Sequence, residues 1–400
     1  MATNAFKNTQ LVVDGTIDAL HKGDPFIGLI DKQYDSKFAR AGAKVGATIS
    51  IKKPARFTTA TGAVTTPQDY VEEWVTLTLG TQRQGSMEFG SVEDTLDLNS
   101  FKKDVADPFG MQMSNDIAED VLSSVITSVG NCIVSTSTLK QKDVVDAGVK
   151  MTQGTTPTAG RCLLIDPADE GDYTIANSGL FNPSSEIAKE FTESAVGRAN
   201  GFDWFRSNNL PVITMPADVV GAVTTTYTAG AETLALKDFG VGQVIQAGTV
   251  FTIAAVNAVK TESKQNLGFG FQVSVRETIT LSGTGTGTVS IEPMYSSAEG
   301  GRQNVTALPL ANAVVTLAGG ASKSYRQQLC FIKKAFTMGT ADLVNLMTGH
   351  SARSNFEGIA GRFVQDGDAV NDTNISRFDV LYGQRCLRPE YACKIWVEVV

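Results

Sequence analysis

The longest run of apolar residues at helical spacing lies within residues 101–134, while the rest of the chain alternates like β-strands or follows no clear period. The apolar stripe is a set of residues spaced by four: Met113, Ile117, Val121 and Val125. Ser100, or Asp107 followed by Pro108, is a typical helix start, and Gly130 is a typical end. We therefore predict one long helix of up to ~30 Å, which suits an element lying across a sheet.

Apolar and polar residues alternate in several short segments, which predicts β-strands. The predicted strands cover residues 47–51, 70–79, 161–166, 327–336, 356–363, 375–387 and 392–399. In the last strand, Lys394 and Trp396 lie on the face opposite to Ile395. Two further helices are predicted, one over residues 10–21 and one starting at residue 182. This mixed order of elements predicts an α+β protein.

Residues 47–51 and 70–79 are two predicted strands with a long connection, in which residues 58–68 are almost all Thr, Ala, Gly and Pro. Val75 and Leu77 lie on the same face of the second strand. A connection so poor in core residues predicts an extended hairpin that projects from the body and needs a partner to stay ordered. A plain surface loop is the alternative.

The composition changes between Pro216 and Pro293, where Thr, Val, Gly and Ala dominate and charges are few. Alternating runs over residues 249–256, 270–275 and 288–292 are separated by glycine-rich turns. This pattern predicts an all-β module of about 80 residues, which is the size of a domain. Because helix and strand patterns of the earlier kind resume at Tyr325, we expect the module to be inserted into a parent domain.

Composition and charge narrow the class of protein. Hydrophobic residues make up 42% of the 400 residues and charged residues 19%, and 38 glycines favour β structure with many turns. The net charge of −8 predicts no general attraction to nucleic acid or to an anionic membrane. No apolar run suits a signal peptide or a membrane span, so we expect no membrane partner and folding in the cytoplasm. Five cysteines without a C-x-x-C pair favour reduced, mostly buried thiols.

Residues that carry enzyme chemistry are scarce. The two histidines, His21 and His350, lie outside any catalytic or metal-binding motif, which argues against a hydrolytic triad and a transition-metal site. Asp366 and Asp368 lie in an acidic loop without EF-hand spacing, so a solvated turn is favoured over a Ca²⁺ site. Residues 283–287 lack the lysine of a phosphate loop and predict a hairpin turn. We therefore predict no enzyme, no catalytic residue, no metal and no cofactor.

Several motifs, taken in order, resemble those of a known family. GFDWFRSNNLPVIT at residues 201–214, LYG at residues 381–383 and RPE at residues 388–390 look like the major coat protein of the short-tailed Salmonella phage family that carries an inserted β domain. LIDPAD at residues 164–169 and the strand at residues 242–253 are similar to further parts of that family. The similarity is patchy in identity and runs in register from about residue 10 to residue 390.

This resemblance implies the Hong Kong 97-type capsid fold with an inserted all-β barrel domain. The implied parts are an N-terminal arm (1–45), an extended loop with flanking strands (46–98), a spine helix of the peripheral domain (99–135), a first axial and peripheral part (136–215), the inserted barrel (216–296), and a second axial and peripheral part (297–400). It also implies a structural major capsid protein that self-assembles through hexamers and pentamers into an icosahedral head around double-stranded DNA. A scaffolding protein and a portal would be partners in the host cytoplasm, and the virion the final location.

Under this hypothesis the extended loop lies over the spine helix of the next subunit. Apolar contacts would come from three residues of the second loop strand: Trp74, Val75 and Leu77. A basic cluster at Lys52, Lys53 and Arg56 would pair with acidic residues of a neighbouring chain such as Glu72 and Glu73, and a solvated face is the alternative for this cluster. The acidic loop with Asp366 and Asp368 is a further candidate, for contacts around the local symmetry axes.

A carbohydrate-binding or carbohydrate-active protein built on the β module is the alternative function. It would stack sugars on Trp204, Tyr227 or Tyr295 and use Asp366 and Asp368 as its carboxylates. Soluble monomers or small oligomers that bind glycans are the expectation of this alternative.

Overall fold

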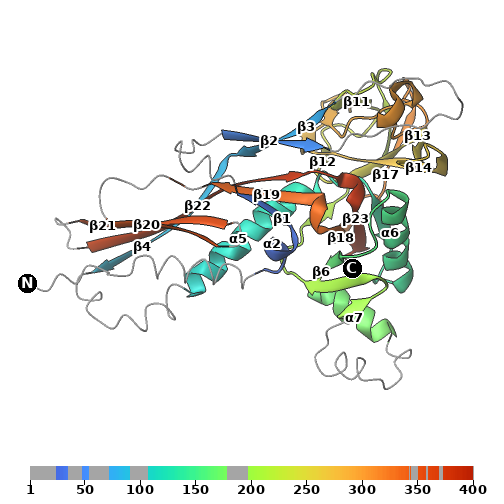
Figure 1. Ribbon diagram of the computed structural model, residues 1–400. Coiled ribbons are helices and arrows are strands. Elements are labelled where there is room, and N and C mark those ends of the chain that lie inside the picture. The colour runs from blue at the N-terminus through green and yellow to red at the C-terminus, as the bar shows by residue number, and fades with distance from the viewer. Residues whose placement is uncertain are drawn as a thin grey trace, which may run out of the picture. The chain divides into compact units, whose positions relative to one another are not determined.

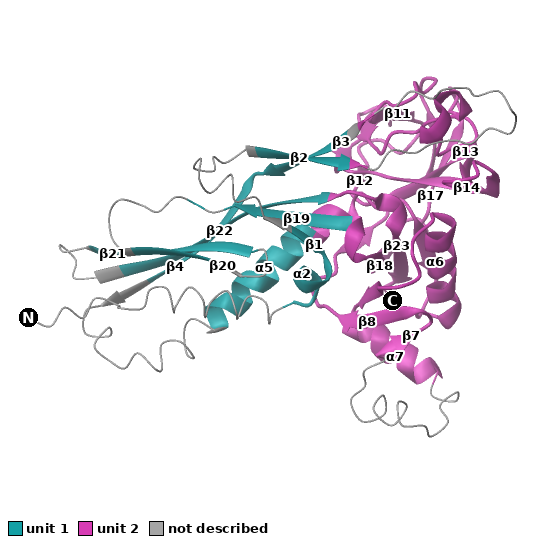
Figure 2. Ribbon diagram, in the orientation of Figure 1, with its two compact units in different colours: residues 1–52, 74–121, 336–385 teal, residues 53–73, 122–335, 386–400 magenta. Residues whose placement is uncertain are grey.

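The structure is a computed structural model that describes residues 24–34, 47–53, 72–90, 107–177, 197–341, 343, 350–356, 359–368 and 373–399. The chain divides into two compact units (Figure 2). Unit 1 comprises Met1–Lys52, Trp74–Val121 and Phe336–Arg385, and unit 2 comprises Lys53–Glu73, Leu122–Ala335 and Cys386–Val400. Helices and many strands occur together (Figure 1), which confirms the α+β class. The predicted helices at residues 10–21 and from residue 182, and the connection 58–68, lie outside the described residues.

Unit 1 is built on a six-stranded sheet with the order β1-β19-β22-β21-β20, in which β4 also pairs with β22 (Figure 1). These strands are β1 (Asp31–Tyr34), β19 (Phe336–Ala341), β22 (Thr373–Cys386), β21 (Ile359–Asp368), β20 (His350–Phe356) and β4 (Thr81–Gly90). The prediction of one strand over residues 356–363 is wrong. Phe356 ends β20 and lies opposite Ile359, which begins the antiparallel strand β21, so the chain reverses between these two residues.

The predicted long helix is α5 (Asp107–Ile126), which begins at the Asp107-Pro108 start, while residues 101–106 lie outside the described part. Its predicted apolar stripe is confirmed, because Met113, Ile117, Val121 and Val125 are all buried. At the start of the helix, the ring of Phe109 packs edge-on against Phe378 of β22, with ring centroids 6.4 Å apart. Gly85 of β4 makes room for this ring, since a β-carbon there would lie 2.1 Å from it.

The N-terminal part of the described chain is tied to unit 1 by a short helix and a strand. The backbone N–H of Phe26 donates to the carboxylate of Asp24 (2.8 Å), and α2 (Phe26–Leu29) follows. Phe26 is fully buried and packs against Phe336, and β1 then pairs in parallel with β19. Burial of one aromatic side chain of this kind contributes about 2 kcal/mol, so the base of the predicted arm is anchored.

Unit 2 contains a seven-stranded sheet with the order β5-β23-β18-β6-β8-β7, in which β9 also pairs with β18. The strands are β5 (Cys132–Ser135), β23 (Ala392–Glu398), β18 (Ser324–Ile332), β6 (Arg161–Ile165), β8 (Phe202–Arg206), β7 (Arg198–Ala199) and β9 (Val212–Thr214). Helices α6 (Gln141–Gln153) and α7 (Pro167–Asn177) belong to this unit and were not predicted. Short 3-10 turns occur at η3 (Ser297–Arg302), η4 (Lys333–Ala335) and η5 (Pro389–Tyr391).

In the region of the predicted β module, unit 2 contains a six-stranded antiparallel sheet and a two-stranded sheet. The larger sheet has the order β14 (Asn266–Ser274), β13 (Val250–Val259), β17 (Val314–Leu317), β10 (Val220–Val223), β11 (Thr233–Lys237), β16 (Gly287–Ser290), and the smaller one pairs β12 (Val244–Ile245) with β15 (Ile279–Thr280). The β module has an apolar core of its own, which includes Phe251, Val289 and Val315. Strand β17 lies beyond the predicted end at residue 296, so this sheet continues to Leu317. Closure of these strands into a barrel stays a prediction.

Candidate subunit-interaction site

Strands β2 (Ala47–Lys53) and β3 (Glu73–Leu79) carry most of the candidate contact residues and pair as a two-stranded sheet. Along β3 the side chains alternate between buried and exposed, as the sequence predicts. Leu77 and Leu79 are fully buried, whereas Trp74 is 54% exposed on the other face. The candidates on β3 therefore point to opposite sides of the strand.

Trp74 is the exposed aromatic residue of this pair of strands. The ammonium group of Lys52 lies 5.8 Å from the centroid of its indole ring, a cation–π contact that is worth about 0.5–1 kcal/mol at an exposed position. The contact holds two candidate residues side by side on one face. Together they offer an apolar ring edge and a positive charge to a partner.

Leu77 lies in the core of its own subunit, and its role as a contact residue stays a prediction. Its side chain has no exposed surface within its own subunit. Neighbouring Leu79 packs with Leu381 and Ala341 of unit 1, and Ile49 of β2 adds to the same cluster. The inward face of β3 thus belongs to the core of the subunit, because strand residues two apart share a face.

The remaining candidates of this region differ in their position and burial. Lys53 ends β2 and is half-buried, and Glu72 is exposed just before β3. Glu73 begins β3, and Arg56 lies outside the described residues. Val75 is half-buried on the inward face. The pairing of basic and acidic residues between neighbouring chains stays a prediction.

Asp366 and Asp368 lie in strand β21, so the predicted acidic loop is wrong at these two residues, while residues 369–372 lie outside the described part. Asp366 pairs with Ile375, and Asp368 pairs with Thr373 of β22. Backbone pairing with a long neighbouring strand overrides the polar composition here. Asp366 is exposed, and so is Ile375 opposite it, at 45%.

A buried carboxylate joins three strands of the unit 1 sheet, and no sequence pattern predicted it. Asp379 of β22 is fully buried and accepts from Arg362 of β21 (2.6 Å) and from Arg377 (2.7 Å). The amide of Gln82 of β4 donates to the same carboxylate (3.2 Å). Charge-assisted bonds of this kind fix the register of neighbouring strands.

A second polar cluster fastens α5 to this sheet. The carboxylate of Asp120 accepts from the guanidinium of Arg83 (2.8 Å) and from the hydroxyl of Tyr382 (2.7 Å). Burial and the bond to Asp120 raise the pKa of the Tyr382 hydroxyl, so this group stays protonated and keeps donating. Arg83 lies in β4 and Tyr382 lies in β22. The two hydrogen bonds therefore hold α5 to both strands.

The β module is joined to the seven-stranded sheet by a buried lysine. Lys394 of β23 has no exposed surface. Its ammonium group donates to the carbonyl oxygen of Gly248 (2.7 Å) and to the hydroxyl of Ser274 (3.3 Å), both in the module. Burial lowers the pKa of Lys394 to about 8. The module thus covers the face of β23 that carries Lys394.

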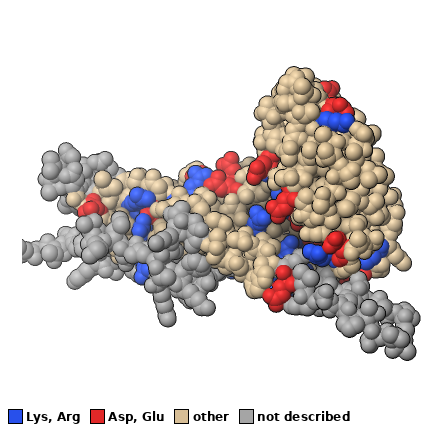
Figure 3. Space-filling view, turned by 90° about the horizontal axis from the view of Figure 1, so that it is seen from above, with Lys and Arg blue, Asp and Glu red and all other residues tan. Residues whose placement is uncertain are grey.

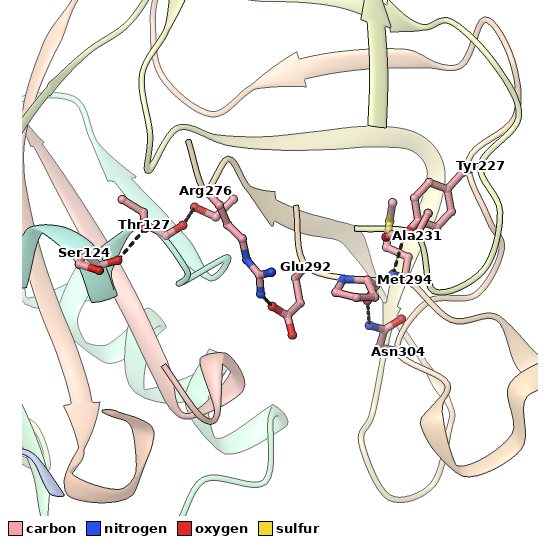
Figure 4. A network of polar contacts seen from close by, with 10 residues as sticks. Ser124, Thr127, Tyr227, Ala231, Arg276, Glu292, Met294 and Asn304 are labelled. Atoms are coloured by element: carbon pink, nitrogen blue, oxygen red, sulfur yellow. Dashed lines mark hydrogen bonds and ion pairs between the residues drawn. The ribbon is translucent and has the colours of Figure 1, made fainter. Parts of the chain in front are cut away.

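Further polar contacts extend this junction. The hydroxyl of Ser274 donates to the carbonyl oxygen of Thr127 (2.6 Å), and Thr127 donates to Ser124 of α5, seen in Figure 4. The same view shows Arg276 of the module paired with Glu292. These contacts hold the first residues after α5 against the β module.

The residues of the carbohydrate alternative do not form a stacking platform. Trp204 is 8% exposed, and its indole N–H donates to the carbonyl oxygen of Ala199 (3.1 Å). Tyr227 is also buried, and its hydroxyl accepts from the N–H of Met294 (3.1 Å) and donates to Ala231 (Figure 4). Tyr295 is half-buried under the guanidinium of Arg302. Trp204 and Tyr227 thus pack in the core, and Tyr295 packs at its edge.

The described residues offer little ligand chemistry. No three His, Cys, Asp or Glu side chains among them gather in a way that holds a metal ion. Four cysteines are buried and Cys386 is half-buried, all as free thiols. No helix in the described ranges has the length and apolar character that crossing a lipid bilayer requires. On the face seen in Figure 3, the described Lys, Arg, Asp and Glu side chains form small mixed groups without a broad area of one sign.

The amino-acid sequence matches the family described as "P22 coat protein - gene protein 5" over residues 1–394. The chain belongs to the P22 coat protein family. A "Major capsid protein" of Acyrthosiphon pisum secondary endosymbiont phage 1 is 23% identical to this coat protein over 418 residues, which cover 97% of this chain and 98% of the relative. Membership in the family confirms the resemblance that the motifs indicated, and it makes the chain a structural capsid protein of a bacteriophage.

Solved capsid structures also align with this coat protein over most of its length. The capsid of Ralstonia phage GP4 aligns with a TM-score of 0.46 at 8% identity, over 93% of this chain and 86% of that chain. The capsid of a native GTA particle aligns with a TM-score of 0.46 at 7% identity, over 95% and 90%. Both TM-scores lie below 0.5, so the family assignment rests on the sequence.

Proposed function

We propose that this coat protein adopts the Hong Kong 97-type capsid fold and self-assembles through hexamers and pentamers into an icosahedral head that encloses double-stranded DNA. Assembly takes place in the host cytoplasm with a scaffolding protein and a portal. Membership in the coat protein family over residues 1–394 is the observation that carries this proposal. The long helix α5, lying on the sheet of unit 1, is the element that we assign as the spine helix.

The parts of the proposed fold follow the predicted boundaries with one change. Residues 1–45 are the arm, residues 46–98 the extended loop with its strands, residues 99–135 the spine helix, and residues 136–215 the first axial and peripheral part. The inserted domain starts at residue 216 and includes β17, because that strand lies between β10 and β13 in the sheet of the module. The remaining residues up to 400 form the second axial and peripheral part.

Strands β2 and β3 are the proposed surface for a neighbouring subunit. One face of β3 is already buried in the core of the subunit, so the opposite face is the one that a partner can cover. Trp74 supports this assignment, because more than half of a large aromatic side chain remains exposed next to Lys52. Aromatic residues of this kind dominate the binding energy of protein interfaces.

The β module is proposed to stabilise the subunit. Lys394 reaches the module from β23, next to the edge of the seven-stranded sheet, and burying a charge without hydrogen bonds costs several kcal/mol. The carbonyl of Gly248 and the hydroxyl of Ser274 therefore supply the acceptors that the buried ammonium group of Lys394 needs. The two parts are expected to fold together.

Deletion of residues 58–68 in the full-length chain tests the proposed role of the extended loop. The shortened protein is expected to fold, with a circular dichroism spectrum and an unfolding midpoint close to those of the parent protein, and to remain unassembled in the presence of scaffolding protein. Shells of normal size from the shortened protein would contradict the proposal that this loop joins neighbouring subunits.

A further inference from the structure

Strand β5 lies at an edge of the seven-stranded sheet, because it pairs only with β23 in the described order. Successive residues of a strand direct their backbone N–H and C=O groups to opposite sides. The carbonyl oxygen of Asn131 accepts from the backbone N–H of Lys394 in β23 (2.8 Å). The backbone groups of the next residue, Cys132, therefore point away from β23. Unpaired groups at such an edge are a template for another strand.

The sequence of β5 offers no protection of its own. Its four residues are Cys132, Ile133, Val134 and Ser135, without a charge or a proline. Natural edge strands usually carry a charged residue or a proline that prevents pairing with another chain. Uncharged β-branched segments, by contrast, pair readily with copies of themselves. A coat protein brings many identical copies together, so an open edge of this composition would compete with correct assembly.

A side chain of the β module occupies the edge. The backbone N–H of Cys132 donates to the amide oxygen of Gln272 (2.8 Å), and the amide nitrogen of Gln272 donates back to the carbonyl oxygen of Cys132 (3.0 Å). A side-chain amide carries the same donor and acceptor as a peptide group, so Gln272 stands where a neighbouring strand would place a residue. The approach is close, because a β-carbon at Gly130 would lie 2.7 Å from the backbone oxygen of Gln272.

Lys150 of α6 completes the arrangement. Its ammonium group donates to the carbonyl oxygen of Cys132 (2.8 Å) and to the amide oxygen of Gln272 (2.6 Å). The second bond orients the amide, because an ammonium group can donate only to the oxygen side. The carbonyl of Cys132 is thus engaged by two donors, from a helix and from the module.

We propose that Gln272, oriented by Lys150, closes the β5 edge and prevents a second copy of the chain from adding its own strand there. The inserted module then has a part in the specificity of self-association, beyond the structural role of the coat protein. Subunits meet through their intended surfaces because this edge cannot pair.

Gln272→Leu in the full-length chain removes both bonds to Cys132 at similar volume and tests the proposal. Thr316→Leu is the matched control, since Thr316 and Gln272 flank Thr252 on the same face of the module sheet and Thr316 is exposed. Sedimentation velocity below the concentration of shell formation is expected to show Gln272→Leu associating at an about tenfold lower concentration than the parent protein and the control. Hydrogen exchange of the Cys132 amide should be fast in the dilute variant and slow after association.

A second variant separates edge pairing from simple loss of folding. Val134 points its backbone N–H to the same side as Cys132, and proline there removes a donor that an added strand would need. Gln272→Leu combined with Val134→Pro is expected to sediment like the parent protein. The proposal is overturned if the double variant associates as the single variant does, if Thr316→Leu associates equally, or if Gln272→Leu stays monomeric with an exchanging Cys132 amide.

Discussion

Gly383 of β22 lies so close to β3 that a β-carbon at this residue would be 2.1 Å from the carbonyl oxygen of Thr78. The neighbouring atom is backbone and cannot swing away like the end of a flexible side chain. The contact therefore sets how closely β3, the strand that carries Trp74, approaches the sheet of unit 1. Only glycine at residue 383 allows this approach.

Gly383→Ala is expected to push β3 away from β22 and to lower the free energy of unfolding by about 1–3 kcal/mol through overpacking. Urea denaturation followed by circular dichroism measures this change. Gly80→Ala is the matched control, because a β-carbon at Gly80 meets no atom within 4 Å. Equal stability of the two variants would show that β3 can relax without cost.

Substitutions on the two faces of β3 are expected to separate assembly from stability. Leu77→Ala removes a fully buried side chain and should lower the free energy of unfolding by about 2–5 kcal/mol. Trp74→Ala should change it by less than about 1 kcal/mol, because the ring is more than half exposed, and should reduce shell formation. Light scattering with scaffolding protein measures shell formation, and unimpaired assembly of Trp74→Ala would contradict its role as a contact.

The buried carboxylate of Asp379 is expected to be essential for the unit 1 sheet. Asp379→Asn keeps the shape and removes the charge that Arg362 and Arg377 share, so the free energy of unfolding should fall by roughly 3 kcal/mol. Asp366→Asn, an exposed position in β21, serves as the control and should stay within about 0.5 kcal/mol of the parent protein. A neutral effect of Asp379→Asn in urea denaturation would count against the network.

Lys394 makes stability depend on pH in the alkaline range. Its pKa is about 8 in the folded protein and 10.5 in its ordinary state, so between these values the unfolded chain binds more protons than the folded one. The cost of the buried charge, roughly 3 kcal/mol, is present in full below pH 8 and is relieved as the pH rises towards 10.5. The groups that face the ammonium are the Gly248 carbonyl, the Ser274 hydroxyl, the Trp396 ring and the thiols of Cys132 and Cys393.

Lys394→Met isolates this contribution. Burial raises the pKa of the Cys132 and Cys393 thiols to about 12, and these groups titrate in both proteins. The difference in unfolding free energy between the parent protein and Lys394→Met should therefore move in favour of the parent protein from pH 8 to pH 10. A difference that stays constant over this range would show that Lys394 is not buried as a charge.

Elements with one regular period were predictable from the sequence, and the contacts between distant segments were not. The four-residue spacing of Met113, Ile117 and Val121 specifies α5 because a helix buries one face. The reversal between β20 and β21 was missed because only two residues, Glu357 and Gly358, separate Phe356 from Ile359 in the sequence. Helix α6 was missed because its sequence contains Gly148 and many polar residues, and its buried face is narrow.

The candidate site was predictable in part for the same reason. The exposure of Trp74 and the burial of Leu77 follow from strand alternation, but which face meets the core depends on strands some 300 residues away in the sequence, such as β22. The alternation of residues 392–399 does not say which face is covered, and it is the β module that provides partners for the buried Lys394. No local pattern links Gln272 to Cys132 across 140 residues.

The size of the purified full-length protein, measured by sedimentation with negative-stain microscopy, alone and with a scaffolding protein, tests the central claim most directly. Closed shells or curved sheets of subunits are the predicted result for a self-assembling coat protein. A stable monomer that never assembles, even with the scaffolding protein present, would contradict it.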